Sequence, residues 1–105
     1  MTAPAYTHAV VVKLLAKPET AEEVAAFLVG AITLANDEAG TPVWFSVRSD
    51  ETTFWVFDAF TSEAGLRAHA VAPFPEMLRR DNGRLFAAPP EVSVSTVLGA
   101  KVPTC

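Results

Sequence analysis

The stretch that decides the fold runs from residue 43 to residue 60 and reads VWFSVRSDETTFWVFDAF. Its two halves, Val43 to Ser49 and Thr52 to Phe60, are rich in β-branched and aromatic residues, which favour strands. The polar residues where the halves meet, Ser49, Asp50 and Glu51, form a turn of hairpin length. The stretch is therefore predicted to be a β-hairpin.

A strand and a helix are predicted before the hairpin. The strand covers His8 to Lys17, where valine and leucine dominate, and Pro18 ends it. Thr20 with Glu23 has the spacing of a capping box, so Thr20 is expected to cap the helix that follows. Apolar residues then recur at helical spacing, which predicts an amphipathic helix to about Asn36.

Two helices and a strand are predicted after the hairpin. Thr61 or Ser62 can cap a helix that runs to Ala70. A shorter helix is expected from Pro75 to Gly83, with Arg79 and Arg80 on its solvated face. The last strand is expected over residues 91–100. The order β-α-β-β-α-β is typical of a ferredoxin-like fold, an α+β arrangement on an antiparallel sheet, here as a single domain over residues 5–101.

Composition limits the kinds of protein this chain can be. Its 105 residues suit one domain, and 50% of them are hydrophobic, which is enough to form a core. Eight basic residues against twelve acidic ones provide no basic surface for nucleic acid. Cys105 is the only cysteine, so no internal disulfide is possible. No apolar run has the length of a signal peptide or membrane span, so a cytoplasmic protein without membrane partners is expected.

The predicted strands are apolar on both faces. In the hairpin, Val43, Phe45 and Val47 share one face, and Trp55 and Phe57 lie on one face of the next strand. Two helices cannot cover both faces of one sheet, and an uncovered apolar face exceeds what soluble monomers usually expose. A second copy packed sheet against sheet would cover it, so a homodimer is predicted.

Several short motifs together carry a family resemblance. They are Asn36-Asp37-Glu38-Ala39-Gly40-Thr41, the strand Phe54 to Phe60, Thr61-Ser62-Glu63-Ala64, His69 with Phe74, and Pro89-Pro90 before the last strand. In this order and spacing, from about Ala9 to Lys101, the chain resembles the antibiotic biosynthesis monooxygenase family.

The resemblance implies a dimeric α-β barrel with a pocket between the sheet and the helices of each unit. It also implies oxidation of a small phenolic or quinol-type aromatic by O2 without flavin, haem or metal. The sequence agrees with the absence of a cofactor, because it has neither a glycine-rich phosphate loop nor a cluster at metal-ligand spacing.

The chain departs from the family pattern at some positions. Quinone-forming members use polar and aromatic side chains at positions that match Val56, Phe60 and Leu66, none of which can exchange a proton. Haem-degrading relatives need a histidine and an asparagine near the positions of Leu78 and Val12, so haem degradation is disfavoured. The alternative function is a non-catalytic dimeric barrel that binds a small apolar metabolite.

His69 is the candidate catalytic residue. An imidazole gains and loses its proton near neutral pH, so His69 could act as the base that deprotonates a phenol. In the structural alternative, His69 is a helix histidine hydrogen-bonded to a loop carbonyl.

The candidate substrate-binding residues are mostly aromatic. Large aromatic side chains can line a pocket for an aromatic ligand, but on a sheet they more often belong to a core or an interface. Those considered are Trp44, Phe45, Trp55, Phe57 and Phe74.

Two polar residues complete the candidate site. Asp58 lies in an otherwise apolar strand. It could accept a hydrogen bond from substrate, or it could form an ion pair with Arg67 or Arg48. An ion pair with one of these arginines is favoured over the contact with substrate. Asn36 could cap the C-terminus of the first helix or make a polar contact at the mouth of the pocket.

Overall fold

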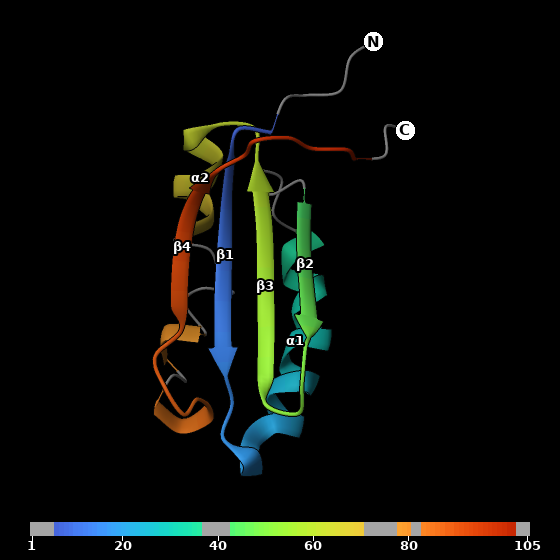
Figure 1. Ribbon diagram of the computed structural model, residues 1–105, viewed down its shortest axis with the longest axis vertical. Helices are drawn as coiled ribbons and strands as arrows, with labels where there is room; N and C mark the ends of the chain where they lie inside the picture. Colours follow the sequence, from blue (N-terminus) through green and yellow to red (C-terminus); the bar gives the residue numbers. More distant parts are fainter. Residues whose placement is uncertain (1–5, 37–42, 71–77, 81–82, 103–105) are drawn as a thin grey trace.

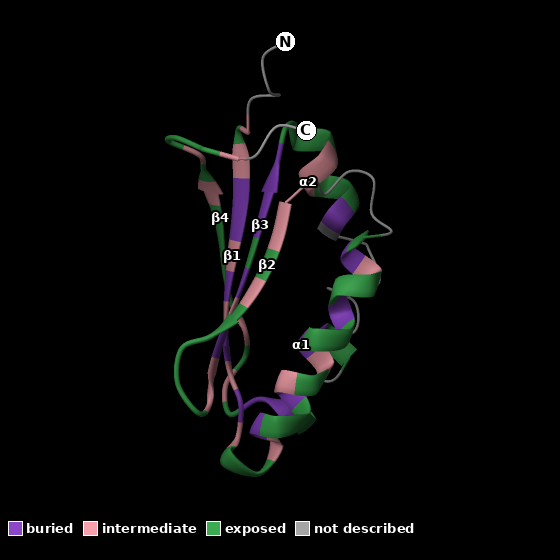
Figure 2. Cartoon of the chain, turned by 90° about the vertical axis from the view of Figure 1, so that its right-hand side faces the viewer, coloured by how far each residue is buried: buried purple, intermediate pink, exposed green. Residues whose placement is uncertain are grey.

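A computed structural model of the chain describes residues 6–36, 43–70, 78–80 and 83–102. One layer is a four-stranded antiparallel sheet and the other consists of helices packed on one of its faces (Figure 1; Figure 2). The elements in chain order are β1 His8–Leu15, the 3-10 turn η1 Pro18–Thr20, α1 Ala21–Asn36, β2 Val43–Arg48, β3 Thr53–Phe60, α2 Glu63–Ala70 and β4 Glu91–Thr96.

The strand order is β2-β3-β1-β4, so the first strand in sequence lies inside the sheet, between the third and fourth (Figure 1). This arrangement confirms the predicted ferredoxin-like α+β fold. No helix in the described ranges combines the length and the apolar character needed to cross a membrane.

Alternation along the strands separates a helix-facing side of the sheet from an open side. Because successive side chains point to opposite faces, the pairs Leu14↔Phe54 and Val12↔Val56 bring buried residues of β1 and β3 onto the same side. α1 covers this side with residues spaced three or four apart along the helix, among them Ala21, Val24, Leu28, Ala31 and Ala35. The core therefore lies between α1 and the helix-facing side.

Two turns have the side-chain hydrogen bonds that their sequences favour. In the β2–β3 hairpin, Asp50 Oδ1 accepts hydrogen bonds from the backbone N–H groups of Thr52 (3.0 Å) and Thr53 (2.8 Å). At the start of α2, Ser62 Oγ accepts from the N–H of Gly65 at 3.1 Å. Ser62 is thus the helix cap, one of the two residues predicted for that role.

The start of α1 differs from the prediction. The capping-box interpretation of Thr20 is wrong, because Thr20 lies within the 3-10 turn and its hydroxyl donates to the backbone oxygen of Leu85 at 2.6 Å. The 3-10 turn η1 leads directly into α1, and Thr20 is its last residue. Thr20 therefore links the start of α1 to the segment before β4.

Three predicted boundaries also differ. β1 ends at Leu15 and not at Lys17. Residues 83–85 are helical, so Gly83 does not end a helix. β4 ends at Thr96 and not at Ala100, because Thr96 pairs with His8, the first residue of β1. Beyond His8 the sheet offers no further strand residue of β1, and a backbone hydrogen bond from Val97 to Thr7 (3.1 Å) closes the ladder.

Candidate functional site

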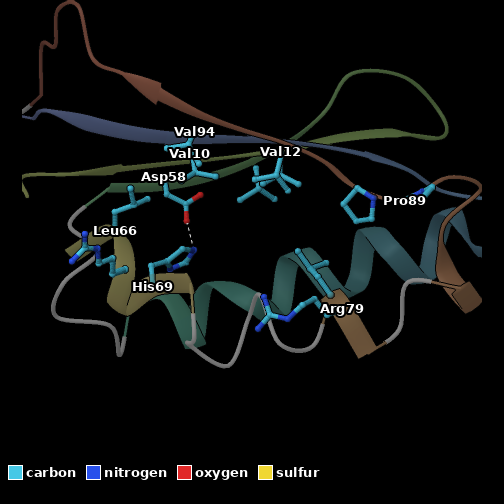
Figure 3. Close-up of a pocket in the computed structure, with 13 residues that line it drawn as sticks. Val10, Val12, Asp58, Leu66, His69, Arg79, Pro89 and Val94 are labelled. Atoms are coloured by element: carbon cyan, nitrogen blue, oxygen red, sulfur yellow. Dashed lines mark ion pairs between the residues drawn. The ribbon is translucent and has the colours of Figure 1, made fainter. Parts of the chain in front are cut away.

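A cavity of about 460 Å³ lies between the helix-facing side of the sheet and the helical layer (Figure 3). Most of its wall is apolar, as is usual for a site that binds a small molecule. Its lining residues are Val10, Val12, Val56, Asp58, Leu66, Arg67, His69, Leu78, Arg79, Pro89, Pro90, Val92 and Val94.

Strand pairing builds the floor of the cavity. Val12 of β1 pairs with Val56 of β3 on one side and with Val92 of β4 on the other. One step along the sheet, Val10 pairs with Asp58 and with Val94 in the same way. The β4 residues Val92 and Val94 are 61% and 65% exposed, so the cavity opens along this edge strand.

Asp58 and His69 form a buried pair in the cavity wall. Asp58 comes from β3 and His69 from α2, and His69 Nε2 lies 2.6 Å from Asp58 Oδ2 (Figure 3). Asp58 is 1% exposed and His69 is 8% exposed. The ring of Phe60 is tilted against the imidazole, with centroids 5.4 Å apart. Carboxylates are almost never fully buried without a partner, and His69 is that partner here.

The pair can hold and exchange a proton next to apolar surfaces. An imidazole can accept a proton, and a carboxylate 2.6 Å from it can stabilise the charge that results. The surrounding valines and Leu66 keep the local dielectric constant low, which strengthens the interaction between the two groups. The hydroxyl group of a ligand in the cavity could therefore contact the Asp58–His69 pair, which is a polar part of this wall.

The prediction that Asp58 forms a pair with Arg67 or Arg48 is wrong. Arg67 bonds Glu63 Oε1 at 2.7 Å, one turn earlier on the same helix, and its side chain is exposed. Arg48 bonds Glu22 Oε2 at 2.7 Å, and this hydrogen bond lowers the pKa of the Glu22 carboxyl. Both arginines reach glutamates at the surface, whereas Asp58 points inward beneath α2.

Among the residues that the structure describes, the predicted aromatic ones lie outside the cavity lining. Trp44 is on the helix-facing side of β2 and packs against the core. Phe45, which is 60% exposed, and its partner Phe57 lie on the open side of the sheet. Trp55 is on that side too, where its Nε1 donates to Ser49 Oγ at 2.9 Å. Phe74 falls outside the described residues.

The remaining polar candidate is also away from the cavity. Asn36 is the last residue of α1, is exposed, and does not line the cavity. Of the predicted site residues in the described ranges, the structure therefore brings together His69 and Asp58.

The sequence interpretation missed several lining residues. Arg79 was expected on a solvated helix face, and it lines the cavity, as does Leu78 beside it. Val92 and Val94 were assigned only to a strand. Their spacing of two residues is a signal that they share one face, but the sequence does not show which face meets the helices.

The chain is similar to several proteins of known structure. Neither a protein-family model nor any curated protein matches it. A protein of unknown function from Nitrosomonas europaea is 37% identical over 98% of this chain and 100% of its own, with a TM-score of 0.93.

Two further structures are more distant in sequence. A monooxygenase of Streptomyces coelicolor, solved in complex with nanaomycin D, is 20% identical over 97% of this chain and 96% of its own, with a TM-score of 0.73. A candidate antibiotic biosynthesis monooxygenase from Bacteroides thetaiotaomicron is 19% identical over 94% and 96%, with a TM-score of 0.74. The chain belongs to the family of the Nitrosomonas protein, and its fold is that of the antibiotic biosynthesis monooxygenases.

Proposed function

We propose that this protein is a cofactor-independent monooxygenase that oxidises a small phenolic or quinol-type aromatic with O2. The observation that carries the proposal is the buried Asp58–His69 pair in the wall of an otherwise largely apolar cavity. The fold, shared with a monooxygenase of Streptomyces coelicolor, supports the same class of reaction. His69 keeps the catalytic role predicted from the sequence, now together with Asp58.

The proposed reaction begins with a proton transfer. An aromatic ring lies against Val12 and Val56, and its hydroxyl reaches the Asp58–His69 pair, which takes the proton. The resulting phenolate is electron-rich and gives electrons to O2. For a hydroquinone, the balanced outcome is hydroquinone plus O2 giving a hydroxyquinone plus water. One oxygen atom forms the new C–O bond, and the other leaves as water after the O–O bond breaks.

The substrate supplies every electron in this scheme. Reduction of O2 to one inserted oxygen and one water takes four electrons, and conversion of the hydroquinone to the hydroxyquinone releases four. The role of the protein is to take the proton, orient the ring and keep water from the phenolate. An apolar cavity with one buried acid–base pair is suited to these tasks.

A second candidate function is binding without turnover. Val56 and Leu66, at positions that match polar or aromatic residues of quinone-forming relatives, line the cavity as apolar side chains. Such a wall would also suit a dimeric barrel that binds or sequesters a small apolar metabolite. Tight binding of an aromatic compound with no product under air would favour this function.

The experiment that tests the oxygenase is O2 uptake with a panel of hydroquinones and anthrones after metals have been removed. The wild-type protein should consume O2 above the uncatalysed rate with at least one compound. Asp58→Asn should lower that rate, and His8→Gln, which changes the other histidine, should not. Uptake at the background rate across the whole panel would contradict the proposal.

We also propose that two copies pack through the open side of the sheet, as predicted from the sequence. Phe45, Val47 and Phe57 are exposed there, next to Trp55. Together they form an apolar surface of the kind that usually marks an interface. A second copy would cover this surface and leave the cavity, on the other side of the sheet, accessible.

A further inference from the structure

Two arginines line a cavity whose wall is otherwise mostly apolar. Arg67 and Arg79 both belong to the lining, whereas the chain as a whole carries twelve acidic and eight basic residues. An acidic chain repels anions in general, so positive side chains at a ligand cavity favour an anion there specifically. The two arginines differ in position: Arg67 lies on α2, where it is bonded to Glu63 at 2.7 Å, and Arg79 lies in the helical segment 78–80.

Arg79 lies on the helical wall, across the cavity from the valines of the sheet (Figure 3). Along the cavity it is placed between His69 and Pro89, and Asp58 belongs to the opposite wall (Figure 3). A ligand can therefore meet two polar groups of different character. One is the Asp58–His69 pair, which can accept a proton, and the other is a guanidinium, which can only donate hydrogen bonds.

We infer that the ligand is a phenolic or quinol-type aromatic that bears an acidic substituent, such as a carboxylate, and that Arg79 binds this anion. The inference rests on the proposed function and deepens it by naming the substrate class. A planar guanidinium binds a carboxylate through two parallel hydrogen bonds. Its five N–H donors allow such binding alongside a contact within the protein.

Electrostatic repulsion determines the orientation of the ligand in the cavity. A carboxylate beside Asp58 would face a like charge at close range, which is unfavourable. With the carboxylate at Arg79, the hydroxyl end of the same molecule is directed toward the Asp58–His69 pair. The ring then lies along the valines of β1, β3 and β4.

The cost of removing the anion from water is small at this position. Arg79 is exposed, and the cavity opens along β4, where Val92 and Val94 are exposed as well. The carboxylate can remain partly hydrated while the ring is buried. An exposed charge pair is also screened by salt, so the preference for an acid should fall as ionic strength rises.

The test measures binding by isothermal titration calorimetry without O2, so that turnover cannot disturb it. The ligands are hydroquinones that carry a carboxylate on the ring, through one methylene or through two, each beside its methyl ester. At low salt, the wild-type protein should bind at least one acid about tenfold more tightly than its ester. Arg79→Gln should abolish this preference, and high salt should weaken it.

Arg80→Gln is the matched control, because Arg80 is the neighbouring exposed arginine and does not line the cavity. It should keep the preference of the wild type. Equal binding of every acid and ester, or equal losses in Arg79→Gln and Arg80→Gln, would overturn the inference. Loss of the preference in Arg67→Gln alone would overturn the assignment to Arg79.

The experiments distinguish a failure of this inference from a failure of the proposed function. Selective binding of acids without O2 uptake under air would contradict the oxygenase and leave this inference in place. O2 uptake with equal binding of acids and esters would support the oxygenase and overturn the inference. Thermal unfolding of each variant shows whether a changed affinity reflects a changed fold.

Discussion

Asp58 shows how the chemistry of a single residue depends on its position in the fold. It is 1% exposed, lies in an apolar strand and has its carboxylate 2.6 Å from His69. Removing one partner of a buried polar pair leaves the other unsatisfied, which typically costs about 1–3 kcal/mol. The two residues should therefore be regarded as one functional unit.

The first prediction concerns the proton acceptor. Because alanine at position 69 would leave Asp58 without its polar partner, the substitution to make is His69→Gln, which retains a polar side chain there. The loss of general-base catalysis should lower kcat by about 100- to 10,000-fold. Binding of a neutral aromatic should change far less, since apolar walls supply most of that affinity. Steady-state O2 uptake and equilibrium binding measure the two effects.

A series of substrates makes this test specific. A phenol that ionises readily needs little help from a base, so the penalty of His69→Gln should grow as the phenol of the substrate becomes less acidic. His8→Gln should show no such trend. A penalty that stays constant along the series would mean that His69 does not take the proton.

The sequence identified both members of the pair but not the pairing. Asp58 is conspicuous in an apolar strand, and His69 is the only histidine outside the first strand. Which side chain of α2 meets β3 depends on how that helix is rotated against the sheet. Arg67 and His69 are two residues apart on α2, so they point in different directions. The sequence alone offered no means to choose between them.

At the scale of elements, the packing of α1 on the sheet supplies the core. Leu14 of β1 is completely buried in that core. Leu14→Ala should lower the free energy of unfolding by about 2–5 kcal/mol, because it removes buried methyl groups and leaves a cavity. Leu98→Ala is the matched control, since Leu98 is 99% exposed and should change stability little. Urea denaturation measures the free energy of unfolding of both variants. Equal losses of stability in the two variants would contradict the place of Leu14 in the core.

The β2–β3 hairpin makes a prediction about pH. Hydrogen bonds from Thr53 and from the backbone N–H of Thr52 lower the pKa of the Asp50 carboxyl below its usual value. A group whose pKa is lower in the folded state stabilises the fold above its unfolded pKa, about 3.9, and this contribution is lost as the pH falls through the folded value. Asp50→Ala should therefore destabilise the protein at pH 7.

The difference between wild type and Asp50→Ala should narrow below about pH 4, where the carboxyl becomes protonated. Urea denaturation at several pH values measures it. Asp50→Asn is the control, because it keeps an oxygen acceptor for the turn but cannot titrate. A difference that does not vary with pH would show that the charge of Asp50 has no role in the turn.

The bounds of most elements could be predicted because their signals are local. The hairpin strands and α2 lie within a residue of the expected limits, since turn residues and caps mark their ends. The end of β4 could not be predicted in this way, because it depends on where β1 begins. The hydroxyl of Thr20 was misassigned for a similar reason, since its acceptor is Leu85, far along the chain.

At the scale of the whole molecule, the two sides of the sheet have different roles. The helical layer covers one side and encloses the cavity there, while no described helix covers the other (Figure 2). The open side could be predicted from the sequence, because its apolar residues alternate with those that face the helices. The cavity could not, because its shape depends on how the helices sit on the sheet.

The proposed dimer makes the last prediction. A lysine in place of Val47, on the open side of the strand β2, would have to be buried without a partner when two sheets pack together, which is costly. Val47→Lys should therefore weaken the dimer by about tenfold or more in Kd, as measured by sedimentation equilibrium. Val29→Lys is the matched control, because Val29 is also an exposed valine but lies on α1. It should dimerise like the wild type. A monomeric wild type, or equal dissociation of the two variants, would contradict packing through this side of the sheet.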